Sequence, residues 1–389
     1  MNSFFKDFVE VAKKIYGEDS IPLHRPVLEG NEKKYLEECI DSNFVSSAGN
    51  KVFEFEKLVA EFTGSKHAIS TVNGTAALHI ALELGGVRYD EEVITQALTF
   101  VATCNAISYV GAKPLFIDVD LDTLSLSPVS LKDFLEKNCE RRIDGTYNKI
   151  SKKKISACVP MHTFGFPGRI GEIAKICFEW NIPMIEDAAE ALGSYSGKLH
   201  VGNFGLMSSL SFNGNKIITT GGGGMVITNN SDLASKLKHF TTTAKLPHKY
   251  EFLHDEIAYN YRMPNLNAAL GCAQIERLKE FLTIKNELAD IWESFFDPRK
   301  VKFFRAINGN KANHWLNSII LPSRTERDNF LNFTNENAVM TRPVWKLMSQ
   351  LPMFSQCQTD GLKNSIWLQD RLVNIPSSVP DRDLKNILF

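Results

Sequence analysis

The sequence predicts an α/β protein in which helices cover both faces of a mostly parallel sheet, followed by a smaller α+β domain. From His67 onward, short β-branched segments alternate with segments whose apolar residues have helical spacing, which is typical of parallel sheets. After Pro264 the pattern changes to one long helical stretch and then to mixed strands and polar helices. A chain of 389 residues also tends to form two packed units rather than one.

The elements are expected in the following order. Strands of the main sheet are predicted over residues 67–72, 92–96, 113–119, 155–160, 182–189, 208–212 and 224–229. Helices are predicted over residues 73–86, 99–112, 169–180 and 265–296, the last as a connecting helix, and a further strand over residues 317–322. We divide the chain into an N-terminal amphipathic helix (1–20), a large domain (21–263) and a connecting helix with a small C-terminal domain (264–389).

The composition argues against several classes of protein. With 44 Lys and Arg against 45 Asp and Glu, the chain is not expected to bind nucleic acid or a membrane surface. Seven scattered cysteines without a C-x-x-C pair suit free thiols in the cytosol. Charged residues interrupt the apolar ones in residues 1–20, so no signal peptide is expected, and no run is long enough to span a membrane. The sequence therefore predicts a soluble cytoplasmic protein.

The nine histidines give no sign of a metal site. They contain no H-E-x-x-H motif, and His248 and His254 lie near each other without neighbouring cysteines. We expect no bound metal.

Three polar signals stand at the ends of predicted strands, where ligands collect in open parallel sheets. Residues 73–75 (Asn-Gly-Thr) open a helix whose free N–H groups would favour an anion, or they are an ordinary N-cap. Glu186 and Asp187 follow a buried run, and they need a cation, a ligand or a structural ion pair. Lys216 follows the next strand.

Lys216 lies within the stretch SFNGNKIITTGGGGMV, which resembles a phosphate-binding loop only superficially. That loop needs G-x-x-x-x-G-K-[ST], and no G-K-[ST] occurs; the dinucleotide motif G-x-G-x-x-G is missing as well. The four glycines at 221–224 lie between two predicted strands. We expect the chain to turn there or to pass close to another group.

A lysine, an acid and an anion site at sheet edges together match the needs of pyridoxal 5′-phosphate (PLP). This cofactor takes a lysine for its Schiff base, an acid opposite its pyridinium nitrogen and N–H groups for its phosphate. An adjacent carboxylate would keep the ring nitrogen protonated at neutral pH.

The segments NGTAALHIAL, TFVATCNAI, IEDAAEALGS, SFNGNKIITTGGGGMV and YNYRMPNLNAALG resemble the DegT/DnrJ/StrS family of nucleotide-sugar aminotransferases. The resemblance runs from about residue 21 to at least residue 278. It implies the PLP-dependent fold type I, with a mostly parallel seven-stranded sheet. It also implies a homodimer with shared active sites.

The resemblance assigns roles to single residues. Lys216 would form the Schiff base, Asp187 would pair with the pyridinium nitrogen, and Phe100 would stack on the ring. Gly74, Thr75 and Ser211 would hold the phosphate together with Asn260 of the neighbouring subunit, and Asn213 would also contact the cofactor. The family often has Gln or His at the position of Glu190, near the phenolic oxygen, so this glutamate would have to be protonated or turned aside.

The resemblance also implies the reaction. L-Glutamate would give its amino group to the C4 keto group of UDP-2-acetamido-2,6-dideoxy-hexos-4-ulose, on routes to legionaminic acid or bacillosamine. The sugar and nucleotide would be bound by residues at matching positions: His24, Arg25, Ser46, Ser47, Lys245, His248 and Trp345.

Three alternatives to this reaction stay open. The enzyme could aminate a 3-keto rather than a 4-keto sugar. A sugar dehydratase of the same fold would have histidine in place of Lys216. A non-catalytic PLP-binding regulator would need an added DNA-binding module, and residues 1–20 are too few for one.

Overall fold

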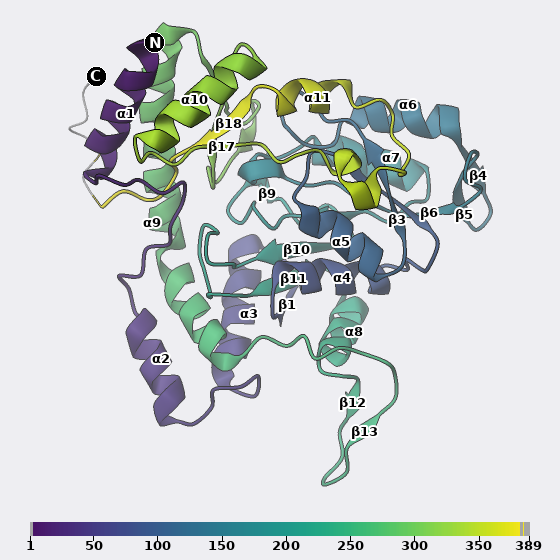
Figure 1. Cartoon of the computed structure of the whole chain (residues 1–389). Helices are drawn as coiled ribbons and strands as arrows, with labels where there is room; N and C mark the ends of the chain where they lie inside the picture. Colours follow the sequence, from purple (N-terminus) through teal and green to yellow (C-terminus); the bar gives the residue numbers. More distant parts are fainter. Residues whose placement is uncertain (1–2, 382–383, 385–389) are drawn as a thin grey trace.

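The computed structural model describes residues 3–381 and Leu384, and in this part of the chain seven strands form one central sheet (Figure 1). Their spatial order is β1-β11-β10-β7-β6-β2-β3, with isolated bridges from Cys158 to Met184 and from Met161 to Asp187 joining the two halves. The strands are β1 (His67–Thr71), β2 (Glu92–Gln96), β3 (Lys113–Ile117), β6 (Lys154–Val159), β7 (Ile185–Asp187), β10 (Met207–Ser211) and β11 (Gly224–Thr228).

The sheet is mostly parallel, as predicted. β2 is parallel to β3 and β6, and β7 is parallel to β10. Only β11, among these strands, runs antiparallel to its neighbours β1 and β10. All residues of β2 and β11 are buried, because helices cover both faces of the sheet.

Side chains of β11 show how the two faces are covered. Val226 packs in a cluster with α4 (Gly74–Leu84) and α8 (Ser231–Thr241). Its neighbours Met225 and Ile227 point to the other face, where α3 (Asn50–Thr63) and α9 (Asn265–Phe296) pack. α5 (Val101–Tyr109) lies with α4 on the first face, and α6 (Pro128–Asn138) and α7 (Ile170–Glu179) form a third cluster with β2, β3 and β6.

The C-terminal part contains a second, antiparallel sheet of order β14-β16-β18-β17. Its strands are β14 (Lys302–Phe303), β16 (Asn317–Ile320), β17 (Arg342–Pro343) and β18 (Leu372–Ile375), and its helices are α10 (Arg324–Glu336) and α11 (Lys363–Gln369). The predicted N-terminal helix is α1 (Ser3–Tyr16), which packs on this part rather than apart from it. Phe8 of α1 has its ring centroid 5.2 Å from that of Trp292 and 4.9 Å from that of Phe330. The domain boundary at residue 263 stays a prediction.

Some elements were not predicted. They are α2 (Glu32–Asp41), α3, α6, α8, α10, α11, the hairpin β4 (Cys139–Arg142) to β5 (Gly145–Asn148), and the short strands β8 (Tyr195–Ser196), β9 (Leu199–His200) and β15 (Asn310–Lys311). A second hairpin, β12 (Lys245–Leu246) to β13 (Leu253–His254), projects from the body of the molecule (Figure 1). None of the described helices is both long enough and apolar enough to cross a membrane.

Candidate active site

A cavity of about 350 Å³ opens where β1, β7 and β10 end. It brings together nine of the residues predicted from the sequence: Gly74, Thr75, Phe100, Asp187, Glu190, Ser211, Asn213, Lys216 and Trp345. It is also lined by Asn73, Leu78, Ala102, Thr103, Met161, Ala189, Asn215 and Trp315. Residues that lie far apart in the sequence thus share one site because the carboxyl ends of parallel strands meet at the same edge.

One end of the cavity is built to hold an anion. Asn73 caps α4, with its Oδ1 accepting the Ala76 N–H at 2.8 Å, so the first N–H groups of the helix face the cavity region without helical acceptors. A Cβ on Gly74 would lie 2.9 Å from the Cβ of Ser211, so only glycine lets the Ser211 hydroxyl stand this close to the helix start. The N-cap of α4 is therefore part of a larger polar cradle.

The glycine run supports the same cradle. A Cβ on Gly224 would come 2.2 Å from the carbonyl oxygen of Asn73, so β11 can pass beside the start of α4 only as glycine. Gly221 has φ of 78°, in the left-handed region where glycine is favoured. Both expectations for this run, a turn and a close approach, are met, at different glycines.

The two acidic residues at the end of β7 have different environments. Glu186 is buried away from the cavity lining and accepts N–H groups of Gly202, Phe204 and Gly205 at 2.7 Å each. Asp187 lines the cavity, where its Oδ2 accepts the Thr103 hydroxyl at 2.7 Å and its Oδ1 accepts the Ala189 N–H at 3.1 Å. Glu186 thus has the structural role, while Asp187 presents a fixed carboxylate to the cavity.

Lys216 and Glu190 form an ion pair inside the cavity. The Lys216 Nζ lies 3.2 Å from Oε1 of Glu190, and Oε2 of Glu190 accepts the Phe164 N–H at 2.8 Å. Burial raises the pKa of Glu190, and the Lys216 ammonium opposes that rise. Glu190 therefore points at the lysine rather than turning aside.

Three polar or aromatic residues of the site were missed from the sequence. Thr103 holds Asp187, and Asn215 lies beside Lys216. Trp315 covers the lysine, with its ring centroid 4.0 Å from the Lys216 Nζ and its Nε1–H donating to the Asn215 carbonyl at 2.7 Å. Trp315 lies two residues before a predicted strand, so its place in the sequence gave no functional signal.

The structure does not bring seven predicted residues into the cavity lining. They are His24, Arg25, Ser46, Ser47, Lys245, His248 and Asn260. Lys245 and His248 lie exposed on the β12–β13 hairpin, and Asn260 is exposed where it pairs with Thr242. Their roles stay predictions.

The N-terminal members of this group have other surroundings. Arg25 pairs with Glu18, and Ser46 accepts the Asn265 N–H at 3.0 Å through its carbonyl oxygen. Burial, with smaller contributions from the charges of Lys285 and Lys216, lowers the pKa of His24 well below its usual value. His24 is therefore neutral, and both of its ring nitrogens are buried without a hydrogen-bond partner among the described residues.

The profile of the DegT/DnrJ/EryC1/StrS aminotransferase family matches residues 26–385. The chain belongs to this family. It is 38% identical over 337 residues to the GDP-perosamine synthase of Escherichia coli O157:H7, covering 86% of this chain and 87% of that protein. It is 36% identical over 351 residues to the putative pyridoxal phosphate-dependent aminotransferase EpsN of Bacillus subtilis, covering 88% and 84%.

Solved structures agree with the fold of this DegT-family aminotransferase. Helicobacter pylori PseC, described as an aminotransferase of pseudaminic acid biosynthesis, superposes with a TM-score of 0.83 at 24% identity, over 92% of this chain and 93% of that one. The predicted fold, the sugar-aminotransferase class and the PLP cofactor are confirmed. The subgroup that makes legionaminic acid or bacillosamine is not.

The cavity of the aminotransferase fits PLP. It offers an amine at Lys216, a fixed carboxylate at Asp187 and a cradle at Gly74 whose backbone a Cβ would obstruct. The exposed ring of Phe100 and the indole of Trp345 bound the open side. Lysine, acid and anion site are the three groups that the cofactor requires.

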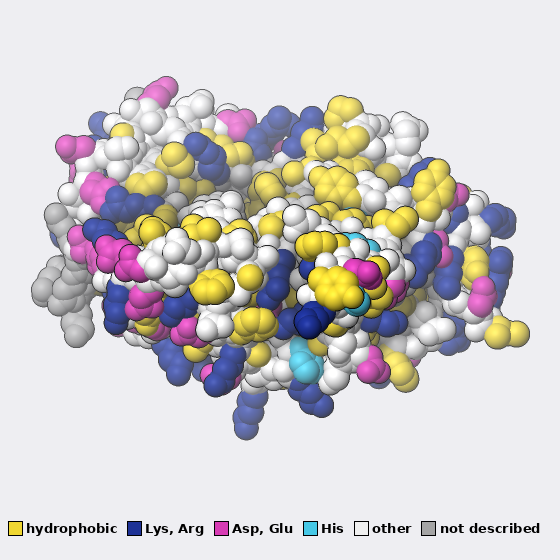
Figure 2. Space-filling view, turned by 90° about the horizontal axis from the view of Figure 1, so that it is seen from below, with side chains coloured by type: hydrophobic (Ala, Val, Ile, Leu, Met, Phe, Trp, Pro, Cys, Tyr) yellow, Lys and Arg dark blue, Asp and Glu magenta, His cyan; other side chains and the backbone are white. Residues whose placement is uncertain are grey.

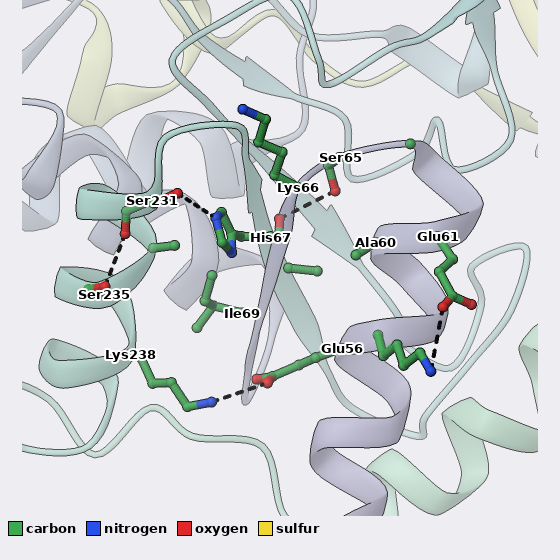
Figure 3. A pocket seen from close by; sticks show the side chains of 14 residues that line it. Glu56, Ala60, Glu61, Ser65, Lys66, His67, Ile69, Ser231, Ser235 and Lys238 are labelled. Atoms are coloured by element: carbon green, nitrogen blue, oxygen red, sulfur yellow. Dashed lines mark hydrogen bonds and ion pairs between the residues drawn. The ribbon is translucent and has the colours of Figure 1, made fainter.

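A second hollow, of about 640 Å³, lies between α3 and α8 of the aminotransferase (Figure 3). Its polar side chains pair with one another: His67 Nε2 lies 2.9 Å from the Ser231 hydroxyl, and Lys238 Nζ lies 3.7 Å from a Glu56 carboxylate oxygen. Because these groups are already satisfied, the hollow offers less to a ligand than the smaller cavity around Lys216.

Proposed function

We propose that this enzyme transfers the amino group of L-glutamate to the C4 keto group of a nucleotide-linked 4-keto-6-deoxy sugar. The observation that carries this proposal is the meeting of Lys216, Asp187 and the N-terminus of α4 in one cavity. PLP, when bound there, supplies an electron sink for the carbon that gains or loses a proton. The protein supplies the groups that hold the cofactor and move the proton.

Each group has a defined task in this proposal. Lys216 Nζ would anchor the cofactor, and as a free amine it would carry the proton between the reacting carbons. Asp187 keeps the ring nitrogen protonated, and Thr103 keeps the carboxylate in place. Gly74, Thr75 and Ser211 receive the phosphate at the positive end of α4.

Glu190 completes this set. Its carboxylate lies 3.2 Å from the Lys216 Nζ, so it can hold the amine before the cofactor or substrate engages it. The open side of the cavity, at Phe100 and Trp345, is where the sugar and its nucleotide enter.

Two carriers are supported by different observations. Three relatives that are 34–38% identical to this chain are named GDP-perosamine synthase, which favours a GDP-linked sugar as the first candidate. The segments at residues 21–49 and 246–274 resemble enzymes that act on UDP-2-acetamido-2,6-dideoxy-hexos-4-ulose, which makes that sugar the second candidate.

A substrate panel tests the proposal. The enzyme is incubated with glutamate and GDP-, UDP- or dTDP-linked 4-keto and 3-keto sugars, and products are identified by NMR. We expect a 4-amino sugar from one carrier, strongly preferred, and no product with Lys216→Ala. Amination at C3, or turnover of none of these sugars by PLP-loaded enzyme, would reject the proposal.

We further propose that the active enzyme is a homodimer. The β12–β13 hairpin projects from the molecule, and it and the segment after it expose Tyr250, Phe252 and Ile257 at 77%, 79% and 92%. Two such short strands are at best marginally stable on their own in water, so a second copy packed against them would stabilise the hairpin and cover its exposed apolar side chains. Hydrophobic side chains are also spread over the middle of the face seen from below, whereas many charged ones lie toward its edges (Figure 2).

Subunit mixing tests the shared sites of this dimer. Asn260 follows the hairpin and would reach the partner's cofactor. Mixed dimers of Lys216→Ala and Asn260→Ala subunits should regain activity, because one of their two sites contains both intact residues. Failure to regain any activity in confirmed mixed dimers would count against shared sites.

A further inference from the structure

Trp315 contacts both the amine of Lys216 and the backbone that carries it. Its ring centroid lies 4.0 Å from the Lys216 Nζ, within the range of a cation–π contact. Its Nε1–H donates to the carbonyl of Asn215, the residue before the lysine, at 2.7 Å. The indole therefore restricts both the amine of Lys216 and the backbone just before this residue.

The backbone of Trp315 is fixed to the same side of the cavity. The Oδ1 of Asn313 accepts the Trp315 N–H at 2.9 Å, and its Nδ2 donates to the carbonyls of Glu190 and Leu192 at 2.9 Å each. Glu190 also contacts Lys216. Asn313 therefore fixes the positions of Trp315 and Glu190 relative to each other, around the Lys216 amine.

Lys285 holds this segment from behind. It lies in the middle of α9, is 1% exposed, and its Nζ donates to the carbonyls of His314 at 3.1 Å, Trp315 at 3.3 Å and Ser377. Burial lowers the pKa of Lys285 to about 7. Its three acceptors are all main-chain oxygens, so a costly buried amine is used to fix backbone rather than to form an ion pair.

We propose that Lys285 and Trp315 together position the amine of Lys216, with Lys285 acting through Trp315. This inference rests on the proposed role of Lys216 in the reaction. Lys285 belongs to α9, and its acceptor Ser377 follows β18. The position of the Lys216 amine therefore depends on how the C-terminal part of the chain packs. Trp315 and Lys285 are positioning residues, because neither is assigned a bond to the reacting atoms.

The test measures the reactivity of Lys216 in cofactor-free protein. Each variant is mixed with PLP, sampled over time, reduced with borohydride and digested, and the modified Lys216 peptide is quantified by mass spectrometry. kcat and KM for glutamate are measured on the loaded enzyme, and a thermal melt shows that each variant is folded. Trp367→Leu serves as control, since Trp367 lies on α11 outside the cavity lining.

We expect Trp315→Leu to slow the modification of Lys216 about 10-fold and to lower kcat about 10-fold, with little change in KM. A loss of this size corresponds to the loss of one cation–π contact. Trp315→Phe, which keeps a ring face but loses the N–H donor, should lie between this variant and wild type. Lys285→Met should show the same defect. The double variant Trp315→Leu/Lys285→Met should be no worse than Trp315→Leu, because the two residues act in series.

Other results would overturn the inference. Folded Lys285→Met with wild-type kinetics of Lys216 modification would do so, as would defects that add in the double variant. If Lys285→Met does not fold, wild-type kinetics of Lys216 modification in Trp315→Leu overturn the inference. Slower modification in both Trp315→Leu and Lys285→Arg supports it. If wild-type protein is not modified at Lys216 at all, the proposed function fails instead, so the two failures are distinct.

Discussion

Single residues set the chemistry of the cavity, and Asp187 depends on one neighbour in particular. The Thr103 hydroxyl donates to its Oδ2 at 2.7 Å, and both groups are buried. A hydrogen bond to a charged group contributes about 1.5–3 kcal/mol. The orientation of the Asp187 carboxylate toward the cavity therefore depends on a residue with no chemistry of its own.

Removing this hydroxyl should weaken catalysis without unfolding the protein. Thr103→Val keeps the shape of the side chain and loses the donor, so we expect kcat/KM for glutamate to fall about 10-fold to 100-fold. Thr103→Ser restores the hydroxyl and should recover most of that loss. Steady-state kinetics of the PLP-loaded variants check this; equal rates for Val and wild type would show that Asp187 needs no such support.

The sequence predicted the cavity residues that stand at strand ends better than those that hold them in place. Lys216, Asp187 and Gly74 stand at strand ends, where the pattern of the chain itself marks a ligand site. Thr103 and Trp315 act only through contacts made by folding, Thr103 from the first turn of α5 and Trp315 from beyond α9. Nothing local distinguishes them from residues of the hydrophobic core.

Among the elements, α9 packs against α3 through one close contact. A Cβ on Gly271 would lie 2.7 Å from the ring of Phe55 in α3, and that ring packs edge-on at 4.9 Å against Phe212, next to Ser211. The absence of a side chain at Gly271 of α9 thus lets α3 sit close to β10, the strand that ends at Ser211 of the polar cradle.

Two helical glycines should respond in opposite ways to alanine. Gly271→Ala gains up to about 1 kcal/mol of helix propensity but forces Phe55 to move, so we expect net destabilisation of about 1–3 kcal/mol. Gly171 in α7 has its nearest neighbour atom at 4.0 Å, so Gly171→Ala should be neutral or stabilising. Urea unfolding measures both, and a stabilised Gly271→Ala would disprove the tight contact.

Element prediction succeeded for the strands of the central sheet and for the connecting helix, and it missed several outer helices and the two-residue strands. The predicted spans of β2 and α9 coincide with Glu92–Gln96 and Asn265–Phe296. The β12–β13 hairpin pairs only two residues on each strand, too few for a period of two to be seen. α1 was predicted as a helix, but its packing partners in α9 and α10 lie far along the chain and could not be read from its own residues.

For the whole molecule, buried histidines set the response to acid. His200 Nε2 accepts the Gly193 N–H at 2.8 Å, which requires a neutral ring, and burial lowers the pKa of His200 to about 4 and that of His314 to about 3. The unfolded chain binds these protons near pH 6.5, so it takes up more protons than the folded chain below that pH. These two histidines therefore lower the free energy of unfolding as pH drops from 6.5 toward 4.

One variant isolates one of these protons. His200→Gln can still accept the Gly193 N–H but cannot be protonated, so the slope of unfolding free energy against pH should be shallower by about 1.4 kcal/mol per pH unit between pH 6 and 4.5. Urea titrations at several pH values give the two slopes. Identical slopes would mean that His200 is protonated equally in the folded and unfolded chains.

Lys216 is proposed to bind the cofactor of this aminotransferase covalently, and borohydride reduction tests that role. PLP-loaded protein is reduced with borohydride, digested and analysed by mass spectrometry, with Lys216→Ala treated in parallel and assayed for amino-group exchange with glutamate. We predict a single adduct on the peptide that contains Lys216, and neither adduct nor exchange in Lys216→Ala. An adduct on another lysine, or exchange at the normal rate in Lys216→Ala, would contradict the claim.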